Sequence, residues 1–281
     1  MKLLRVGVIG QEKPAILDTD YNIRDLSQII EDINPELLAK NFSDLKNLDI
    51  EQLPILSSNE RIAPCVADVG KFICIGLNYS DHAKESNAAI PNEPIIFNKW
   101  TSAISGANDQ ILLPRNSVKT DWEVELGIVI GREGRYISEE NALEYVAGYC
   151  VINDISEREY QLERGGSWDK GKGCDSFGPI GPWLVTKDEV KDPQQLELWL
   201  EVDGQRYQQG STKNMIFSVA KIISYLSQFM SLQPGDIIAT GTPAGVGMGQ
   251  KPPKFLQHGQ VVRLGIDGLG VQQQQVVEAA A

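Results

Sequence analysis

Histidine and cysteine are scarce in this sequence, which has two histidines and four cysteines among 281 residues. No two cysteines form a C-x-x-C pair, so we expect neither a zinc site nor a framework of disulfide bonds. His258 precedes Gly259 in an apparent turn and suggests no chemistry. His82 is therefore the one histidine that we consider as a general base.

Positive charge is also in deficit, with Lys+Arg 26 against Asp+Glu 38 and a formal net charge of -12. A protein that binds nucleic acid usually carries a basic stripe, and the sequence has none. No apolar stretch approaches the length of a membrane span, and the start of the chain is too short and too broken for a signal peptide. We therefore expect a cytoplasmic protein in a reducing environment, with no nucleic-acid or membrane partner.

The composition is ordinary for a globular protein, because 42% of the residues are hydrophobic and 23% are charged. Short apolar runs separated by turn residues predict many strands, whereas few segments, among them 138–145 and 214–230, have helical spacing. Residues 155–176 are charged and Gly-rich, and we expect an irregular loop there. We predict a β-rich α+β fold, with a small N-terminal α+β domain at 1–65 and a larger domain at 66–281.

Two glutamates occupy one predicted strand, at 121–130. Successive side chains of a strand point to opposite faces, so Glu123 and Glu125 project together. Two adjacent carboxylates repel each other and are costly to bury unless a cation lies between them. Asp154 ends the next predicted strand, 146–153, and would add a third oxygen ligand for Mg²⁺, Mn²⁺ or Ca²⁺. The alternative is a half-solvated strand whose two acids face water.

A histidine and a glutamate are separated by three positions at His82 and Glu85. On a helix this spacing puts both side chains on one face. A carboxylate beside an imidazole orients the ring and raises its pKa, as a base that activates water requires. The alternative is a surface salt bridge in a charged turn.

Two glycine-rich stretches can approach a ligand closely. Lys172 lies between two glycines, where its ammonium can neutralise a developing enolate oxygen, although most loop lysines are simply solvated. Residues 241–247 follow a predicted strand and can offer backbone N–H groups and a hydroxyl to a carboxylate. This stretch is neither a Walker loop nor a Rossmann fingerprint, so nucleotide binding is not expected.

Taken together, these motifs resemble the fumarylacetoacetate hydrolase superfamily. The matching stretches, in the order of that superfamily, are 75–85, 123–127, 153–158, 172–179 and 240–247. The resemblance implies a mixed β-sandwich roll like the C-terminal domain of fumarylacetoacetate hydrolase, which would be the catalytic domain at 66–281. It also implies a small N-terminal domain and assembly as a homodimer.

The resemblance also assigns roles to individual residues. The metal ligands, for Mg²⁺ or Mn²⁺, would be Glu123, Glu125 and Asp154; the catalytic residues would be His82, Glu85 and Lys172; and the substrate contacts would be Lys99, Arg158, Gln161 and Thr242. The mammalian enzyme has a further aspartate ligand near the place where this chain has Ile75. The sequence therefore resembles the bacterial-type branch with three ligands, and within it the hydrolases of 2,4-diketo-3-deoxy sugar acids of the L-rhamnonate and L-fuconate type.

The activity implied is hydrolysis of a carbon–carbon bond in an acylpyruvate-type 2,4-diketo acid, which yields pyruvate and a carboxylic acid. Three alternatives remain open. An oxo-acid decarboxylase, tautomerase or isomerase would need the same metal and the same enolate stabilisation. A ureidoglycolate lyase would release glyoxylate, and a protein that only binds its ligand would turn over no diketo acid.

Overall fold

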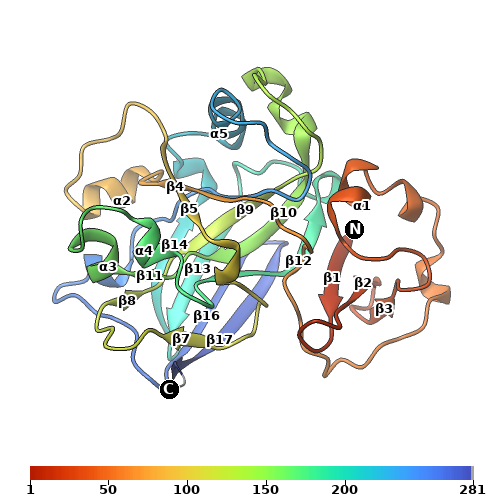
Figure 1. The fold of residues 1–281 in the computed structure, drawn as a ribbon, viewed down its shortest axis with the longest axis horizontal. Coiled ribbons are helices and arrows are strands. Elements are labelled where there is room, and N and C mark those ends of the chain that lie inside the picture. Colours follow the sequence, from red (N-terminus) through yellow and green to blue (C-terminus); the bar gives the residue numbers. More distant parts are fainter. Residues whose placement is uncertain (280–281) are drawn as a thin grey trace.

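The computed structural model describes residues 1–279 of the chain. Two β-sheets form its frame, and helices and loops cover their ends (Figure 1). The predicted β-rich α+β class is confirmed. No helix among residues 1–279 combines the length and hydrophobicity that are needed to cross a bilayer.

The larger sheet has ten strands, in the order β3-β2-β1-β12-β10-β9-β15-β4-β5, with β6 paired to β12. The smaller sheet has five strands, in the order β14-β13-β16-β17-β7, and β8 pairs separately with β11. The strands of the larger sheet are β1 (Lys2–Val6), β2 (Lys13–Leu17), β3 (Ile23–Asp25), β4 (Phe72–Gly76), β5 (Ile95–Lys99), β6 (Ile104–Ser105), β9 (Val124–Ile130), β10 (Val146–Asn153), β12 (Gly178–Thr186) and β15 (Ile237–Ala239). The others are β7 (Ile111–Leu113), β8 (Thr120–Asp121), β11 (Ser156–Glu157), β13 (Glu197–Val202), β14 (Gln205–Ser211), β16 (Val261–Ile266) and β17 (Gly270–Glu278).

The helices are short. The α-helices are α1 (Pro35–Ala39), α2 (Ser80–Glu85), α3 (Arg158–Leu162), α4 (Asp169–Lys172) and α5 (Val219–Leu226). The 3₁₀ turns are Ser43–Leu45, Ile50–Gln52, Thr101–Ala103, Glu139–Tyr145, Lys187–Glu189, Thr212–Asn214 and Gly247–Gly249. Figure 1 shows α2, α3 and α4 gathered on one side of the molecule, and the N-terminal strands lie on the opposite side.

The main core fills the space between the two sheets, and β9 lies at its centre. Leu126 and Ile128 of β9 belong to the same buried cluster as Leu200 of β13 and Leu264 of β16. Val129, on the opposite face of β9, belongs to a second cluster. All of β9 is therefore buried, and the face that carries Glu125 is not open to water as a half-solvated strand would be.

The N-terminal strands continue the larger sheet, because β1 pairs antiparallel with β12 and aligns Leu3 with Leu184. Leu26 and Ile33 belong to the same buried cluster as Ile152 of β10. The first part of the chain thus shares both a sheet and a core with the rest. The domain boundary between residues 65 and 66 stays a prediction from sequence.

Three predicted segments differ from the structure. The stretch 155–176 is not wholly irregular: it contains β11, α3 and α4, and the Glu157 carboxylate caps α3 by accepting from the N–H of Tyr160. The helix expected at 214–230 is limited to α5. Its start is delayed because the Asn78 side chain bonds both the N–H and the C=O of Phe217, and Ser218 then caps the helix. The helix expected at 138–145 is present as a 3₁₀ turn.

Candidate active site

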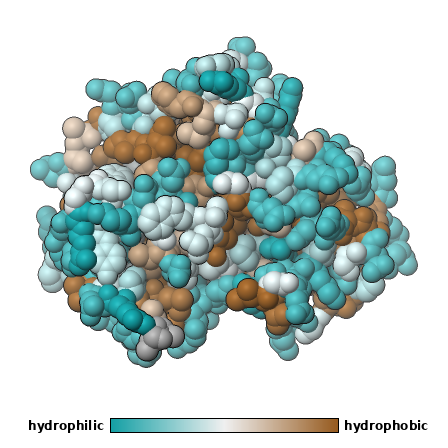
Figure 2. All heavy atoms as spheres, in the orientation of Figure 1, coloured by the Kyte–Doolittle hydropathy of each residue, from teal (hydrophilic) through white to brown (hydrophobic). Residues whose placement is uncertain are grey.

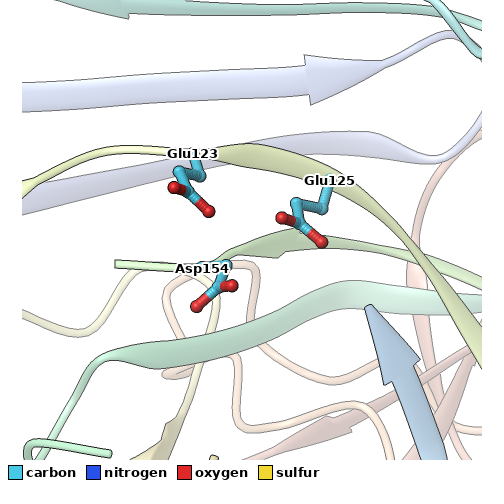
Figure 3. A group of neighbouring side chains, drawn as sticks. All are labelled: Glu123, Glu125 and Asp154. Atoms are coloured by element: carbon cyan, nitrogen blue, oxygen red, sulfur yellow. The ribbon is translucent and has the colours of Figure 1, made fainter. Parts of the chain in front are cut away.

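Strand pairing brings three acidic side chains together. In the antiparallel register of β9 and β10, Asn153 is opposite Val124, and the next N–H, that of Asp154, donates to the carbonyl oxygen of Glu123 at 2.9 Å. One carboxylate oxygen from each of Glu123, Glu125 and Asp154 lies within 4.8 Å of the others, and all three residues are buried. Figure 3 shows the three side chains as neighbours, with Glu123 and Glu125 on one stretch of chain and Asp154 on another.

This cluster fits a divalent cation. Burial, together with Asp154 and Glu123, raises the pKa of Glu125 well above its usual value. The N–H of Gly241 donates to Glu125 Oε2 at 2.7 Å, but no Lys, Arg or His side chain among residues 1–279 forms an ion pair with it. A buried acid beside two others, without a cationic partner, is stabilised by a hard cation that takes oxygen ligands.

Lys172 links two of the three carboxylates. Its Nζ atom lies 2.8 Å from Glu123 Oε2 and 2.8 Å from Asp154 Oδ2. Burial lowers the pKa of Lys172, but Asp154 and Glu123 outweigh this effect and the pKa rises, so the ammonium stays charged. For Glu123 the effects are reversed: burial raises its pKa, but the positive charges of Lys172 and Arg158 outweigh burial and bring the pKa below its ordinary value. The third proton of Lys172 remains for a ligand in the adjoining cavity.

Lys99 contacts Asp154 outside the cavity lining. Its fully buried ammonium lies 2.5 Å from Asp154 Oδ1 and 3.0 Å from the carbonyl oxygen of Ile155. The resemblance assigned Lys99 to substrate contact, but its side chain does not line the cavity. Its place in the structure is that of a residue that fixes the Asp154 carboxylate.

His82 and Glu85 lie on one face of α2, as their spacing predicted. His82 Nδ1 lies 3.2 Å from Glu85 Oε2, so the Nδ1–H tautomer donates to the carboxylate and leaves Nε2 as an acceptor. Both oxygens of the Glu85 carboxylate also accept the N–H of Gly245, Oε1 at 3.0 Å and Oε2 at 3.1 Å. A Cβ on Gly249 would lie 2.5 Å from the Glu85 carboxyl carbon, so the loop after β15 closes tightly around this carboxylate.

Arg158 fixes the orientation of Gln161. Its guanidinium donates to Asp121 Oδ2 at 2.8 Å, lies 2.7 Å from Glu123 Oε1, and donates to Gln161 Oε1 at 3.0 Å. Because the amide oxygen of Gln161 is used in this way, its NH₂ group remains as a donor toward the cavity. Asp121 also accepts the N–H groups of Gly247 and Met248. No sequence pattern indicated a role for Asp121, although it begins the predicted strand 121–130 that carries Glu123 and Glu125.

Thr242 and Gln208 fix the peptide between the two glutamates. The Thr242 hydroxyl donates to the carbonyl oxygen of Val124 at 2.9 Å and accepts from Gln208 Nε2 at 2.8 Å. Gln208 Oε1 in turn accepts the N–H of Val124 at 3.0 Å. The single hydroxyl proton of Thr242 is thus already used within the protein. Gln208 lies on β14, in the other sheet, and no local sequence pattern indicated its role.

These groups surround a cavity of about 300 Å³. Of the residues assigned from the sequence, those that line it are His82, Glu123, Glu125, Arg158, Gln161, Lys172 and Thr242. Three of the assigned residues do not line the cavity. Glu85 contacts the lining residue His82, and Asp154 contacts the lining residue Lys172. Lys99 contacts Asp154. The cavity therefore combines a histidine held by a carboxylate, two acids, and a lysine that also binds the third acid.

Comparison with known proteins agrees with this arrangement. Residues 71–277 match the family model described as fumarylacetoacetate hydrolase C-terminal. A Burkholderia lata protein, whose name gives a hydrolase without a substrate, is 60% identical over 99% of this chain and 100% of its own. The fumarylacetoacetate hydrolase of Exiguobacterium antarcticum is 36% identical, with a TM-score of 0.90 over 99% of this chain and 100% of that one.

Two further solved structures cover the whole of both chains. The maleylpyruvate hydrolase of Sphingobium sp. SYK-6, solved with manganese(II) and pyruvate, is 28% identical with a TM-score of 0.83. The 2-hydroxyhepta-2,4-diene-1,7-dioate isomerase of Mycobacterium marinum is 31% identical with a TM-score of 0.79. The family match spans well over half of the chain and includes all the residues that form the cavity. The protein belongs to the fumarylacetoacetate hydrolase family.

Proposed function

We propose that this protein is a metal-dependent hydrolase that cleaves a carbon–carbon bond of an acylpyruvate-type 2,4-diketo acid. The products are pyruvate and a carboxylic acid. The observation that carries the proposal is that a His–Glu pair and a lysine-bridged acidic cluster face one cavity. A related hydrolase that was solved with manganese(II) and pyruvate supports both the metal and the product.

The acidic cluster would hold Mg²⁺ or Mn²⁺ through Glu123, Glu125 and Asp154. A bound cation would supply Lewis-acid polarisation of the oxo and carboxylate oxygens of the substrate. The NH₂ group of Gln161, fixed by Arg158, would donate to the same carboxylate. The substrate head is then oriented before any bond changes.

His82 would act as the general base. Its Nε2 takes a proton from water, and the resulting hydroxide attacks the C4 carbonyl carbon of the diketo acid. The C3–C4 bond breaks, its electron pair forms the enolate of pyruvate, and the carboxylic acid leaves. Lys172 donates its remaining proton in a hydrogen bond to the enolate oxygen, and C3 then takes up the proton from His82.

Other reactions of the same site remain candidates. An isomerase, tautomerase or decarboxylase would also need the acidic cluster and Lys172, and the similarity to the Mycobacterium marinum isomerase favours testing for one. An isomerase or tautomerase would release no pyruvate, and a decarboxylase would release carbon dioxide. A ureidoglycolate lyase would release glyoxylate instead, and a protein that only binds oxo acids would release neither.

The test is a panel of 2,4-diketo acids, assayed for pyruvate with Mg²⁺ or Mn²⁺ and again with a chelator. The panel includes the 2,4-diketo-3-deoxy acids of the L-rhamnonate and L-fuconate type that the sequence resemblance favours. We expect metal-dependent pyruvate release from at least one acylpyruvate. Absence of pyruvate across the panel would refute the proposal. Homodimer assembly, which the resemblance implies, is measured separately by light scattering.

A further inference from the structure

The part of the cavity next to Lys172 is an aromatic wall. Lys172 Nζ lies 5.0 Å from the ring centroid of Phe97, and the Phe97 ring meets that of Trp168 edge to face at a centroid distance of 5.4 Å. Both rings line the cavity. Whatever extends from the substrate head past Lys172 therefore meets aromatic carbon rather than polar groups.

The position of the Trp168 ring is fixed from two directions. A Cβ on Gly76 would lie 2.7 Å from the indole, so only a glycine at the end of β4 allows the ring to pack there. The backbone carbonyl of Trp168 accepts the N–H of Lys172 at 3.1 Å, which ties the start of α4 to the catalytic lysine. The indole is thus a preformed surface at a set distance from the acidic cluster.

The wall continues to the mouth of the cavity through further apolar residues. Those that line it are Leu77, Ala88, Ile95, Leu162 and Met248. Leu162, at the end of α3, is 47% exposed and so marks the rim. Figure 2 shows hydrophobic side chains gathered at the surface near α2, with hydrophilic ones around them.

No unengaged cation lines this cavity among residues 1–279. The two cationic side chains in the lining are both held by acids: Lys172 by Glu123 and Asp154, and Arg158 by Asp121 and Glu123. A second carboxylate at the far end of a substrate would be desolvated without a counter-ion. A chain of hydroxyls would likewise find few partners, because Ser86 is the one polar residue of the lining outside the groups already described.

We propose that the substrate is a monocarboxylate whose acyl substituent is uncharged and apolar, and that this substituent lies against Trp168, which determines specificity. The proposal rests on the function proposed above, because it takes the oxo-acid head to lie at the acidic cluster. It differs from the sugar-acid tail that the sequence resemblance favours. The energetic reason is that apolar carbon gains from leaving water in such a site, whereas a charged or hydroxylated tail loses its hydration there.

The experiment measures binding rather than turnover, using 2-oxo acids that have no 4-oxo group and are not cleaved. Calorimetry with Mg²⁺ present compares 2-oxobutanoate and 2-oxohexanoate with 2-oxoadipate and 2-oxo-3-deoxygluconate. We expect affinity to rise by about fourfold for each added CH₂ of the unbranched tails. The charged and hydroxylated tails should bind at least about tenfold more weakly than 2-oxohexanoate.

Two variants and one control test whether the aromatic wall determines which tail is preferred. Trp168→Ala should remove the preference for the longer apolar tail, whereas Trp199→Ala should keep it, because Trp199 stacks on Arg206 and Arg263 of the smaller sheet. Leu162→Lys places a cation at the exposed rim and should improve binding of 2-oxoadipate, independently of how well the Trp168 variant folds.

The outcomes separate this proposal from the one on which it rests. If the natural chain binds 2-oxoadipate or 2-oxo-3-deoxygluconate as tightly as 2-oxohexanoate, or more tightly, the proposal of an apolar tail is wrong. If the Trp168 and Leu162 variants both keep the natural chain's preference among these tails, the aromatic wall does not determine specificity. If oxo acids bind with the expected preference while no diketo acid releases pyruvate, the hydrolase proposal fails and the inference about the tail stands. Absence of any binding would overturn the inference about the tail, whereas the pyruvate assay alone decides the hydrolase proposal.

Discussion

The backbone N–H of Asp154 donates to the carbonyl oxygen of Glu123 at 2.9 Å, just beyond the last paired residues of β9 and β10. This bond places two carboxylates on the same side of two neighbouring strands, and Glu125 follows from the same strand two residues later. The acidic cluster is therefore positioned by a sheet ladder, which is more rigid than a loop. Four predictions follow the contacts of this cluster and of the N-terminal strands.

Glu125→Gln should abolish tight binding of Mn²⁺. Partners in the outer shell of a metal already contribute about 10- to 100-fold to affinity, so loss of a direct ligand should cost more than this. Calorimetric titration with Mn²⁺ measures the effect, and Glu36→Gln, in an exposed pair with Lys40, is the matched control. If the Glu125 variant binds Mn²⁺ as the natural protein does, Glu125 is not a ligand.

Glu85→Gln should keep the metal and lose turnover. The neutral amide removes the negative charge that stabilises the protonated ring of His82, and its NH₂ group competes with its oxygen for Nδ1. General-base catalysis of this kind contributes about 10²- to 10⁴-fold to rate. Pyruvate release and Mn²⁺ binding are measured on the same preparation, with the exposed Glu140→Gln as control. Gly249→Ala should reproduce part of the loss by displacing the carboxylate. Full turnover by Glu85→Gln would exclude Glu85 from the mechanism.

Lys99→Met should destabilise the metal-free protein by about 3 kcal/mol or more, because Asp154 loses a buried counter-ion. A divalent cation would replace part of the missing charge, so Mg²⁺ should raise the melting temperature of this variant more than that of the natural chain. Thermal unfolding with and without Mg²⁺ measures both effects. Lys40→Met, at an exposed ion pair, should show neither. An equal response of Lys99→Met and the natural chain to Mg²⁺ would contradict the role assigned to Lys99.

Asp18 should contribute to acid stability at the turn between β2 and β3. Burial raises the pKa of Asp18, but hydrogen bonds from Asn22 and Arg24 outweigh it and lower the pKa from 3.8 to about 2. A carboxyl whose pKa is depressed in the folded state stabilises the protein above its unfolded pKa. This stability is lost as the pH falls from 3.8 through about 2.

Asp18→Asn should therefore lower stability at neutral pH and flatten the decline over that window. Denaturant unfolding at a series of pH values measures this, and the neighbouring exposed Asp20→Asn is the control. A decline of the same steepness in Asp18→Asn and in the natural chain would show that Asp18 does not titrate as its contacts indicate.

The sequence alone gave those parts of the site that depend on neighbours along the chain. The two-residue period of a strand puts Glu123 and Glu125 on one face, and the helical spacing of His82 and Glu85 brings imidazole and carboxylate within 3.2 Å. The order of the motifs gave the family and the β-rich class. The placements of Glu123 with Glu125 and of His82 with Glu85 could be predicted because local backbone geometry sets them.

Which distant groups complete the site depends on the tertiary structure. The register of β10 against β9 brings Asp154 to Glu123, and the packing of the smaller sheet brings Gln208 to Val124. The fold also places Lys99 behind Asp154 and not in the cavity. Such contacts depend on strand pairing and on packing between residues far apart in the chain, which no local periodicity encodes. For the same reason the aromatic wall at Trp168, and with it the inference about the substrate tail, came from the folded structure.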